Sequence, residues 1–377
     1  MNNRTVAIVT IDDYINYGNR LQNYALTKLL QNEGFKVFNG IRVFTKEDWV
    51  IRTNGTIQKI RNWLTPYRVV RGSLYSPQEK SGLKKEREQR FLDFVHSYTT
   101  VLEPIVCVNH FNANKVLKKY GIDYFIVGSD QVWNPYYEAM EYEFLTFTTK
   151  EKRLSFAASI GVDCIPEGAK RYFKKNLSKM KYISVREERA AQIVKELTGR
   201  DADVTLDPTL LLDKADWEHI IKKPELDIEG RYICTYFLGE VPESVNAFAK
   251  EKGLSIYALN SLDCPKLYTL DPAEFLYMIQ NASYVLTDSF HAVAFSIAFH
   301  KEFYVFERKQ EGVSSMFSRI ETITKRFGLG NRIQSRDRII EQEPISNWSK
   351  IEDELVAEKK RSMGKLLEAM VSGIRGK

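Results

Sequence analysis

The sequence has no long hydrophobic run, so we expect no membrane-spanning helix. No apolar stretch reaches the roughly 18–20 residues that a transmembrane helix needs. The first apolar stretch, Val6 to Ile11, is too short for a secretory signal, and acidic residues follow it directly. The sequence therefore predicts a cytoplasmic protein.

Cysteine is scarce and shows no ligand spacing. No CxxC pair or Cys/His pattern occurs among the 4 cysteines, which are Cys107, Cys164, Cys234 and Cys264. Structural zinc sites and redox pairs depend on such patterns, so we expect no metal. Each cysteine lies in or near an apolar segment, which predicts buried free thiols.

Several motifs that carry chemistry are also absent. No GxGxxG follows a predicted strand and no GxxxxGK[ST] occurs, so dinucleotide and P-loop nucleotide binding lose their support. HExxH and GxSxG are missing too, which removes the zincin and α/β-hydrolase classes. No nucleic-acid-binding motif accompanies the basic residues, so we expect no nucleic-acid partner.

The elements that are present indicate two domains. A chain of 377 residues, 44% of them hydrophobic, exceeds what one core usually supports. Strands alternate with helices from Val6 onward, and a second series starts at "YICTYFLG", which predicts an α/β fold with two Rossmann-like parallel sheets. We assign residues 1–215 to the first domain, with a basic, partly helical insertion around 42–95, and residues 228–345 to the second. The amphipathic C-terminal helix, 350–374, could rejoin the first domain.

The positive charge is concentrated in the insertion. The net charge of the chain is +6, and between Arg42 and Arg90 there are 12 Lys or Arg against 5 Asp or Glu. Apolar residues of 57–71 fall near one helical face, with basic residues around them and Pro66 as an interruption. Such a segment either lies at an anionic membrane surface or packs, solvated, on its own domain.

Polar residues gather at the ends of the predicted strands. Because open parallel sheets bind ligands at the carboxyl ends of their strands, we expect one shared site in a cleft between the domains. The segments concerned are 16–20, 128–134, 159–161, Arg186 and 288–291.

Two of these positions suit an anionic ligand. His291 lies at a strand-to-helix corner, where Asp288 or Ser289 can cap the helix and the helix N-terminus favours an anion. A histidine there could act as a general acid, or it could be a satisfied, packed residue. Arg186 follows a strand and could grip a carboxylate or phosphate, or pair with Glu187 or another nearby acid.

Two loop segments suit hydroxyl recognition. The first is "NYGNR", in which a glycine permits close backbone approach; its residues are Asn16, Tyr17, Gly18, Asn19 and Arg20. The second is "GSDQVWN", a turn followed by polar and aromatic residues that are typical of sugar sites; its candidates are Gly128, Ser129, Asp130, Gln131, Trp133 and Asn134. The alternative for the second is a capped turn with a buried Trp133.

Six motifs together resemble one known family. They are, in order, "NYGNRLQNYAL", "DYFIVGSDQVWNP", "FAASIG", "SVREERAA", "DPTLLL" and "TDSFHAVAFSIAFHKEF". Across roughly residues 5–335 the chain resembles the polysaccharide pyruvyl transferase family. The resemblance implies a GT-B-like arrangement, with the acceptor on the first domain and the donor on the second.

The family resemblance also implies an activity. Its characterised members transfer the enolpyruvyl group of phosphoenolpyruvate to a saccharide and form a pyruvate ketal, with phosphoenolpyruvate as co-substrate and no other cofactor. The acceptor is often a lipid-linked unit of a capsular or other cell-surface polysaccharide. A peripheral contact of segment 57–71 with the inner face of the membrane would suit such an acceptor.

Residue by residue, the resemblance assigns His291 as the general acid and Arg186 as a ligand of phosphoenolpyruvate. Well-studied members have an arginine two positions before the histidine, where this chain has Ser289. The nearest basic replacements for the donor pocket are Arg308 and Lys309, with Lys301 and Arg319 behind them. Two alternatives remain: a nucleotide-sugar glycosyltransferase on the same architecture, and a non-catalytic glycan-binding protein.

Overall fold

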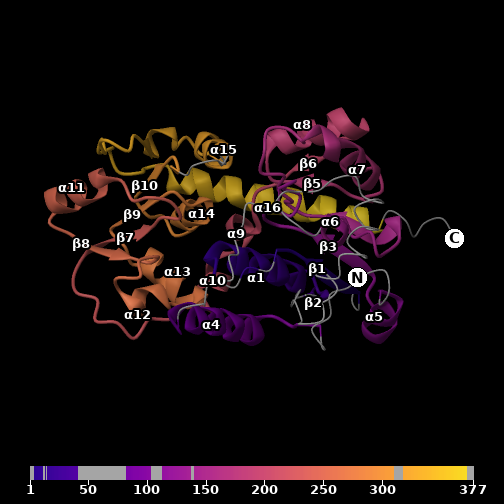
Figure 1. Ribbon diagram of the computed structural model, residues 1–377, viewed down its shortest axis with the longest axis horizontal. Helices are drawn as coiled ribbons and strands as arrows, with labels where there is room; N and C mark the ends of the chain where they lie inside the picture. Colours follow the sequence, from indigo (N-terminus) through magenta and orange to yellow (C-terminus); the bar gives the residue numbers. More distant parts are fainter. Residues whose placement is uncertain are drawn as a thin grey trace.

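A computed structural model describes residues 4–11, 13, 15–40, 82–102, 113–136, 140–309 and 317–371 (Figure 1). The basic segment 57–71, most of the predicted insertion, and Cys107 lie outside these residues. Of the other cysteines, Cys234 is buried but Cys164 is exposed. The prediction of a buried thiol is therefore wrong for Cys164, which lies in the turn after Gly161 rather than in a strand.

The N-terminal half is built on a parallel sheet with strand order β2-β1-β3-β4. Apolar runs such as "TVAIV" and "YFIV" form its central strands, and every residue of these two strands is buried, as parallel sheets require. The elements are β1 (Thr5–Val9), α1 (Tyr17–Asn32), β2 (Lys36–Gly40), α4 (Gly82–Tyr98), α5 (Ala113–Tyr120), β3 (Tyr124–Val127), α6 (Met140–Glu143), η1 (Lys150–Lys152) and β4 (Arg153–Ser155).

A short parallel pair, β5 and β6, follows in the same half. Single bridges from Leu154 to Tyr182 and from Ala158 to Val185 carry the pairing from β4 toward β5. The elements of this part are α7 (Glu167–Leu177), β5 (Ser184–Val185), α8 (Glu188–Thr198), β6 (Asp203–Val204), α9 (Pro208–Leu211) and α10 (Lys214–Glu218).

The C-terminal half has a parallel sheet with strand order β11-β10-β9-β7-β8. Its elements are β7 (Tyr232–Tyr236), α11 (Glu243–Lys252), β8 (Ser255–Ala258), α12 (Pro265–Tyr268), α13 (Pro272–Gln280), β9 (Tyr284–Thr287), α14 (Phe290–Ala298), β10 (Phe303–Phe306), α15 (Ser318–Arg326), η2 (Gly330–Arg332) and β11 (Ile333–Gln334). The predicted α/β fold with Rossmann-like parallel sheets is thus confirmed.

The long helix α16 (Trp348–Val371) runs along both halves, as the yellow ribbon of Figure 1 shows. Near its start, Glu354 and Glu358 pair with Arg326 of α15 at 2.7 and 3.1 Å. At its other end, the carbonyl of Met370 accepts a hydrogen bond from the hydroxyl of Tyr124 in β3. The helix therefore joins the C-terminal half to the N-terminal sheet.

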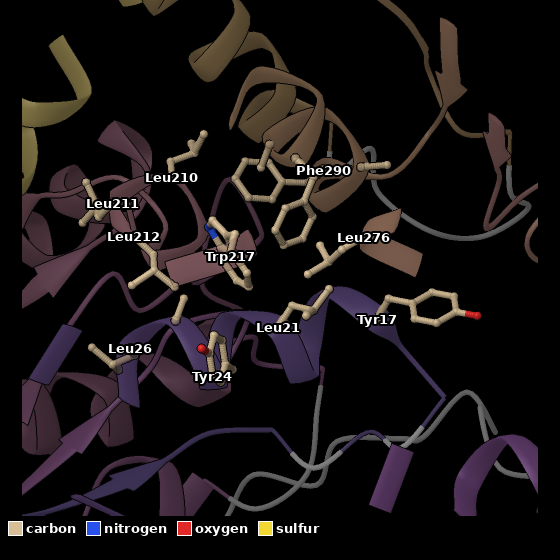
Figure 2. Close-up of a cluster of buried hydrophobic side chains, with 14 of the residues drawn as sticks. Tyr17, Leu21, Tyr24, Leu26, Leu210, Leu211, Leu212, Trp217, Leu276 and Phe290 are labelled. Carbon is tan, nitrogen blue, oxygen red and sulfur yellow. The ribbon is translucent and has the colours of Figure 1, made fainter. Parts of the chain in front are cut away.

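One apolar core extends from the N-terminal half into the C-terminal half. Figure 2 shows side chains of α1, α9, α13 and α14 gathered around Trp217. Tyr17 of α1 stacks on Phe275 of α13 with ring centroids 4.2 Å apart, and Trp217 meets Phe295 of α14 at 5.0 Å. This shared core fixes the starts of α1, α9 and α14 relative to one another.

Helix α1 begins at Tyr17, within the segment "NYGNR" that was predicted as a loop. The side chain of Asn16 accepts a hydrogen bond from the backbone N–H of Asn19 and so caps the helix at Tyr17. Residues Tyr17 to Arg20, predicted as a polar loop, therefore form the first turn of a helix that points at the C-terminal half.

Candidate active site

The candidate site lies where several strand ends meet the start of α14. Ser129 and Asp130 follow β3, Arg186 follows β5, and Asp207 follows β6. His291 lies in the first turn of α14, directly after β9. The structure thus brings together His291, Arg186 and Asp130 from three predicted segments, as expected from the carboxyl ends of parallel strands.

Asp207 is the carboxylate at the centre of this group, and its side chain is fully buried. Its Oδ2 accepts hydrogen bonds from the hydroxyl of Ser129 at 2.7 Å and from Nη1 of Arg186 at 2.5 Å. Its Oδ1 accepts from the backbone N–H and the hydroxyl of Thr209, so that Asp207 caps α9. Burial alone would raise the pKa of Asp207, but Arg186, His291 and these hydrogen bonds outweigh it and lower the pKa to about 2.

Arg186 is buried and ion-paired, which was one of the two alternatives for it. Besides Asp207, it has Asp130 and Glu187 at 3.6 Å, too far for hydrogen bonds. Its guanidinium stacks on the ring of Phe290 at 4.6 Å. Nε and Nη2 donate no hydrogen bond to a described residue, so these two nitrogens could still hold a carboxylate or phosphate.

His291 is buried against the first turn of α1. A Cβ at Gly18 would lie 2.0 Å from its Nδ1, so only glycine permits this contact. Its Nε2 lies 3.9 Å from Oδ2 of Asp207 and has no hydrogen-bond partner among the described residues. Burial lowers the pKa of His291, and Asp207 and Asp130 offset only part of this effect. The imidazole is therefore neutral at pH 7 in the absence of a ligand.

Asp130 links the site to α1. It adopts a left-handed backbone conformation, with φ of 67°, which turns the chain sharply after β3. Its Oδ2 accepts a hydrogen bond from Nδ2 of Asn19 at 3.1 Å, and its Oδ1 accepts from the backbone of Gln131. Burial would raise the pKa of Asp130, but the charges of His291, Arg186 and Arg319 lower it.

The predicted side-chain cap on α14 is wrong. Ser289 is the residue before the helix, but its side chain makes no capping hydrogen bond. Asp288 turns instead to the loop after β7, where its carboxylate accepts from the backbone of Leu238 and Gly239 at 2.7 and 2.8 Å. The first N–H groups of α14 are therefore left without a side-chain cap.

Three of the basic residues predicted to replace an arginine at position 289 differ in their surroundings. Nε and Nη2 of Arg308 lie 3.3 Å from the side-chain and backbone oxygens of Asp288. The side chain of Lys309 is 73% exposed and lies 3.7 Å from Glu240. Lys301 follows the far end of α14, away from His291.

Arg319 lies at the site, although Arg308 and Lys309 were predicted ahead of it as replacements because they are nearer to His291 along the chain. It is buried and lies over the ring of Phe290 at 5.6 Å, the same ring on which Arg186 stacks. Its charge lowers the pKa of both Asp130 and His291. Two buried arginines therefore share one aromatic ring beside His291.

Trp133 is buried, with a side chain that is 1% exposed. The indole stacks on Phe144 at 5.6 Å and donates to the carbonyl of Glu143 at 3.1 Å. Its large apolar surface is thus part of the core beneath the sheet, which was the alternative interpretation of this turn. Next to it, Gln131 and Asn134 are hydrogen-bonded to each other at 2.8 Å.

Two other predicted site residues make structural contacts. The hydroxyl of Tyr17 donates to the carbonyl of Leu270 at 2.9 Å, and its ring is part of the shared core. Arg20 is buried and donates to the side chain of Asn19, which in turn holds Asp130.

Sequence reasoning missed Asp207, although it lies in one of the quoted motifs. The available signal was the "DPT" of "DPTLLL". It does not stand out, because an aspartate before a proline is also the usual start of a helix. Arg87 was missed as well: it donates to the carbonyls of Ile15 and Tyr268 at 2.8 and 3.0 Å. It thereby connects α4 and the approach to α1 with the C-terminal half.

The chain is an α/β protein with Rossmann-like parallel sheets. A buried group of arginines, carboxylates and one histidine lies at the ends of the strands, and this site suits an anionic ligand. The family model of the polysaccharide pyruvyl transferases matches residues 16–310. The chain therefore belongs to the polysaccharide pyruvyl transferase family, and the predicted resemblance is confirmed.

Three of the solved structures that resemble the chain are distant from it in sequence. The UDP-GlcNAc 2-epimerase from Neisseria meningitidis is 10% identical with a TM-score of 0.46, over 99% of this chain and 100% of that chain. The UDP-GlcNAc 2-epimerase from Methanocaldococcus jannaschii is 11% identical, with a TM-score of 0.46 over 97% and 99%. The glycosyltransferase SnogD from Streptomyces nogalater is 8% identical, with a TM-score of 0.41 over 98% and 100%. With TM-scores below 0.5 these likenesses do not bear on function, and no curated protein matches the chain.

The described residues hold neither a membrane-spanning helix nor a group of metal ligands. Of the helices in this part of the chain, none combines the length and the apolar character needed to span a bilayer. In the same residues, no three His, Cys, Asp or Glu side chains are grouped as metal ligands. The predictions of a cytoplasmic protein and of a metal-free site remain predictions.

Proposed function

We propose that the protein transfers the enolpyruvyl group of phosphoenolpyruvate to a saccharide and closes a pyruvate ketal on two of its hydroxyls. The polysaccharide pyruvyl transferase family is a family of transferases, and a saccharide acceptor follows from membership. The observation that supports this donor best is the pair His291 and Arg186, which both lie next to Oδ2 of the Asp207 carboxylate. The GT-B-like arrangement with an acceptor side and a donor side also remains a proposal.

Phosphoenolpyruvate carries nearly three negative charges, so its pocket needs several donors. Nε and Nη2 of Arg186 have no hydrogen-bond partner among the described residues, and the N–H groups at the start of α14 have no side-chain cap. Together these groups suit a phosphate or carboxylate. The buried charge of Arg319 adds to the positive potential at the same ring, so we include Arg319 in the proposed donor pocket in place of Lys309.

An anion bound at this position would change the state of His291. Burial keeps its imidazole neutral in the free protein, but a nearby phosphate or carboxylate favours the protonated form. Donor binding would therefore be accompanied by uptake of a proton at His291. The protonated ring is then the general acid that the reaction needs.

The reaction can be written so that all protons balance. His291 gives its proton to C3 of phosphoenolpyruvate, which makes C2 electrophilic, and one saccharide hydroxyl attacks C2. The bond between C2 and the phosphate oxygen then breaks, and the second hydroxyl closes the ketal. Of the two hydroxyl protons, one returns to His291 and the other leaves with phosphate. Arg186 and the start of α14 would stabilise the departing phosphate.

The acceptor saccharide is assigned to one side of the site. Asn19, Asp130 and Gln131 lie on the side of the site that belongs to the N-terminal half, and we propose this side for the acceptor. A lipid-linked acceptor, a role in capsular or other cell-surface polysaccharide synthesis, and a membrane contact through 57–71 extend the same proposal.

Titration calorimetry with phosphoenolpyruvate tests the donor without knowledge of the acceptor. We expect binding to the unaltered protein and a loss of at least about tenfold in affinity for Arg186→Gln, because a charge-assisted contact is lost. Arg338→Gln changes an exposed arginine and serves as the matched control. Binding of UDP- or GDP-sugars in place of phosphoenolpyruvate would instead indicate a glycosyltransferase, and glycan binding without phosphate release would indicate a non-catalytic protein.

A further inference from the structure

Asp207 makes more contacts than a helix cap requires. Capping of α9 occupies only Oδ1, which accepts from the N–H and hydroxyl of Thr209. Oδ2 accepts from Ser129 and Arg186 and faces His291. The two oxygens of one carboxylate therefore serve different purposes, and only the second contacts the site.

We propose that Asp207 is a positioning residue of the transfer reaction, which holds the guanidinium of Arg186 for the donor and sustains the positive charge of His291. This proposal rests on the proposed function, since it assigns a role within the same site.

The first part of the role concerns Arg186. A buried guanidinium without a counter-charge is strongly unfavourable, and the side chain of Arg186 is 3% exposed. Asp207 pairs with Nη1, while the ring of Phe290 fixes the plane of the group at 4.6 Å. With one corner and the plane fixed, the direction of Nε and Nη2 is set before a donor arrives.

The second part concerns His291. Its Nε2 is 3.9 Å from Oδ2 of Asp207, beyond hydrogen-bond length, so Asp207 acts on the imidazole through charge. The other charged groups that influence the ring are Asp130 of the β3 loop, Arg186 of the β5 loop and Arg319 of α15. From α1, the uncharged Gly18 packs against it. Since the two arginines oppose protonation and the two carboxylates favour it, loss of Asp207 removes the stronger of the two carboxylate effects that favour the protonated ring.

The place of Asp207 in the fold explains why it can serve both groups. It starts α9, and this helix packs against α1, α14 and α16. The carboxylate is thus fixed relative to the N-terminal half through Ser129 and relative to α14 through the packing of α9. A side chain on a loop of either half alone would not keep both distances.

Histidine NMR on the full chain tests the proposal without any substrate. The chain has 5 histidines, and the signals of His291 are identified by their loss in His291→Gln. In Asp207→Asn we expect the titration midpoint of His291 to fall by about one pH unit or more, as Coulomb's law predicts for a charge at this distance. Thr209→Val is the matched control, because it removes a hydrogen bond from Oδ1 and keeps the charge; its midpoint should be unchanged. An unchanged midpoint in folded Asp207→Asn would overturn the proposal.

The kinetic arm separates this proposal from the proposed function. For Asp207→Asn we expect KM for phosphoenolpyruvate to rise by about tenfold or more and the pH optimum to move to lower pH. If phosphoenolpyruvate is not the donor, this arm fails while the NMR shift remains. If Asp207→Asn does not fold, Asp207→Glu keeps the charge but displaces Arg186, so KM should rise while the midpoint of His291 stays near that of the unaltered protein. An unaltered KM in Asp207→Glu would contradict the positioning of Arg186.

Discussion

At the scale of single residues, His291 is held between opposing effects. Burial disfavours its charge, two carboxylates favour it, and two arginines oppose it. The pKa of the imidazole in the free protein is therefore below its ordinary value. In an enzyme that protonates C3 of its donor, the negative charge of a bound donor would favour the protonated form of such a residue.

Replacement of His291 should abolish transfer and leave the fold intact. We expect His291→Ala to lower the rate of ketal formation by about 100-fold or more, the usual contribution of a general acid. Phosphate release from phosphoenolpyruvate measures the rate, and circular dichroism checks the fold. A rate within a few-fold of the unaltered protein would contradict the general-acid role.

The pH dependence of kcat/KM should report the pKa of His291 in the free enzyme. Burial lowers that pKa below its ordinary value of 6.5. The protonated fraction of His291 therefore falls as the pH rises above that value. We therefore expect kcat/KM to decrease by about tenfold per pH unit on the alkaline side. A profile that is flat between about pH 6 and pH 8 would show that no proton from His291 is needed.

At the scale of elements, the start of α1 and the start of α14 are fitted to each other. Gly18 leaves room for the imidazole of His291, and Asn19 in the same turn holds Asp130. Helix α1 thereby places one residue against the proposed acid and another against a carboxylate of the site.

Gly18→Ala should displace His291 and so impair transfer without altering any charged group. The added Cβ would lie 2.0 Å from Nδ1 and 2.1 Å from Cγ of His291, far inside contact distance. We expect at least about a tenfold loss of kcat, since a small misplacement of a catalytic group is costly. Gly364→Ala, within α16 and with nothing within 4 Å of the new Cβ, is the control. It should keep full activity and gain up to about 1 kcal/mol of helix stability.

How much of the site could be read from the sequence depends on the kind of signal at each residue. His291 and Arg186 were found because strand ends are visible as apolar runs followed by polar residues. Asp207 was missed because capping of the following helix is a sufficient reason for an aspartate before a proline. Trp133 was left with two alternatives because a loop sequence does not show which way a large ring turns. Arg319 was placed behind Arg308 because closeness along the chain does not show which helix folds back over Phe290.

At the scale of the whole molecule, the two sheets share a core. Tyr17 and Phe275 come from opposite halves, and their rings stack at 4.2 Å. Arg87 adds a hydrogen bond to the carbonyl of Tyr268 across the same boundary. The sequence predicted the two sheets from their alternating elements, but it could not show this boundary, because an apolar residue that packs between halves looks like one that packs within a half.

Unfolding should therefore be a single cooperative event. We expect one calorimetric transition for the unaltered protein, and one transition at lower temperature for Phe275→Ala, which should cost about 3–5 kcal/mol. Phe248→Ala, in the core cluster on the other face of the C-terminal sheet, provides the comparison. Two separate transitions, of which Phe275→Ala moves only one, would show that the halves are independent.

The bridging helix α16 has a consequence for how the chain folds during synthesis. Its residues Met363, Leu366 and Met370 belong to the core that includes β1, and Met370 meets Tyr124 of β3. Every other described element leaves the ribosome before α16 does. The N-terminal sheet must therefore wait, with part of its apolar surface uncovered, until the last helix emerges, so that the half made first is completed last.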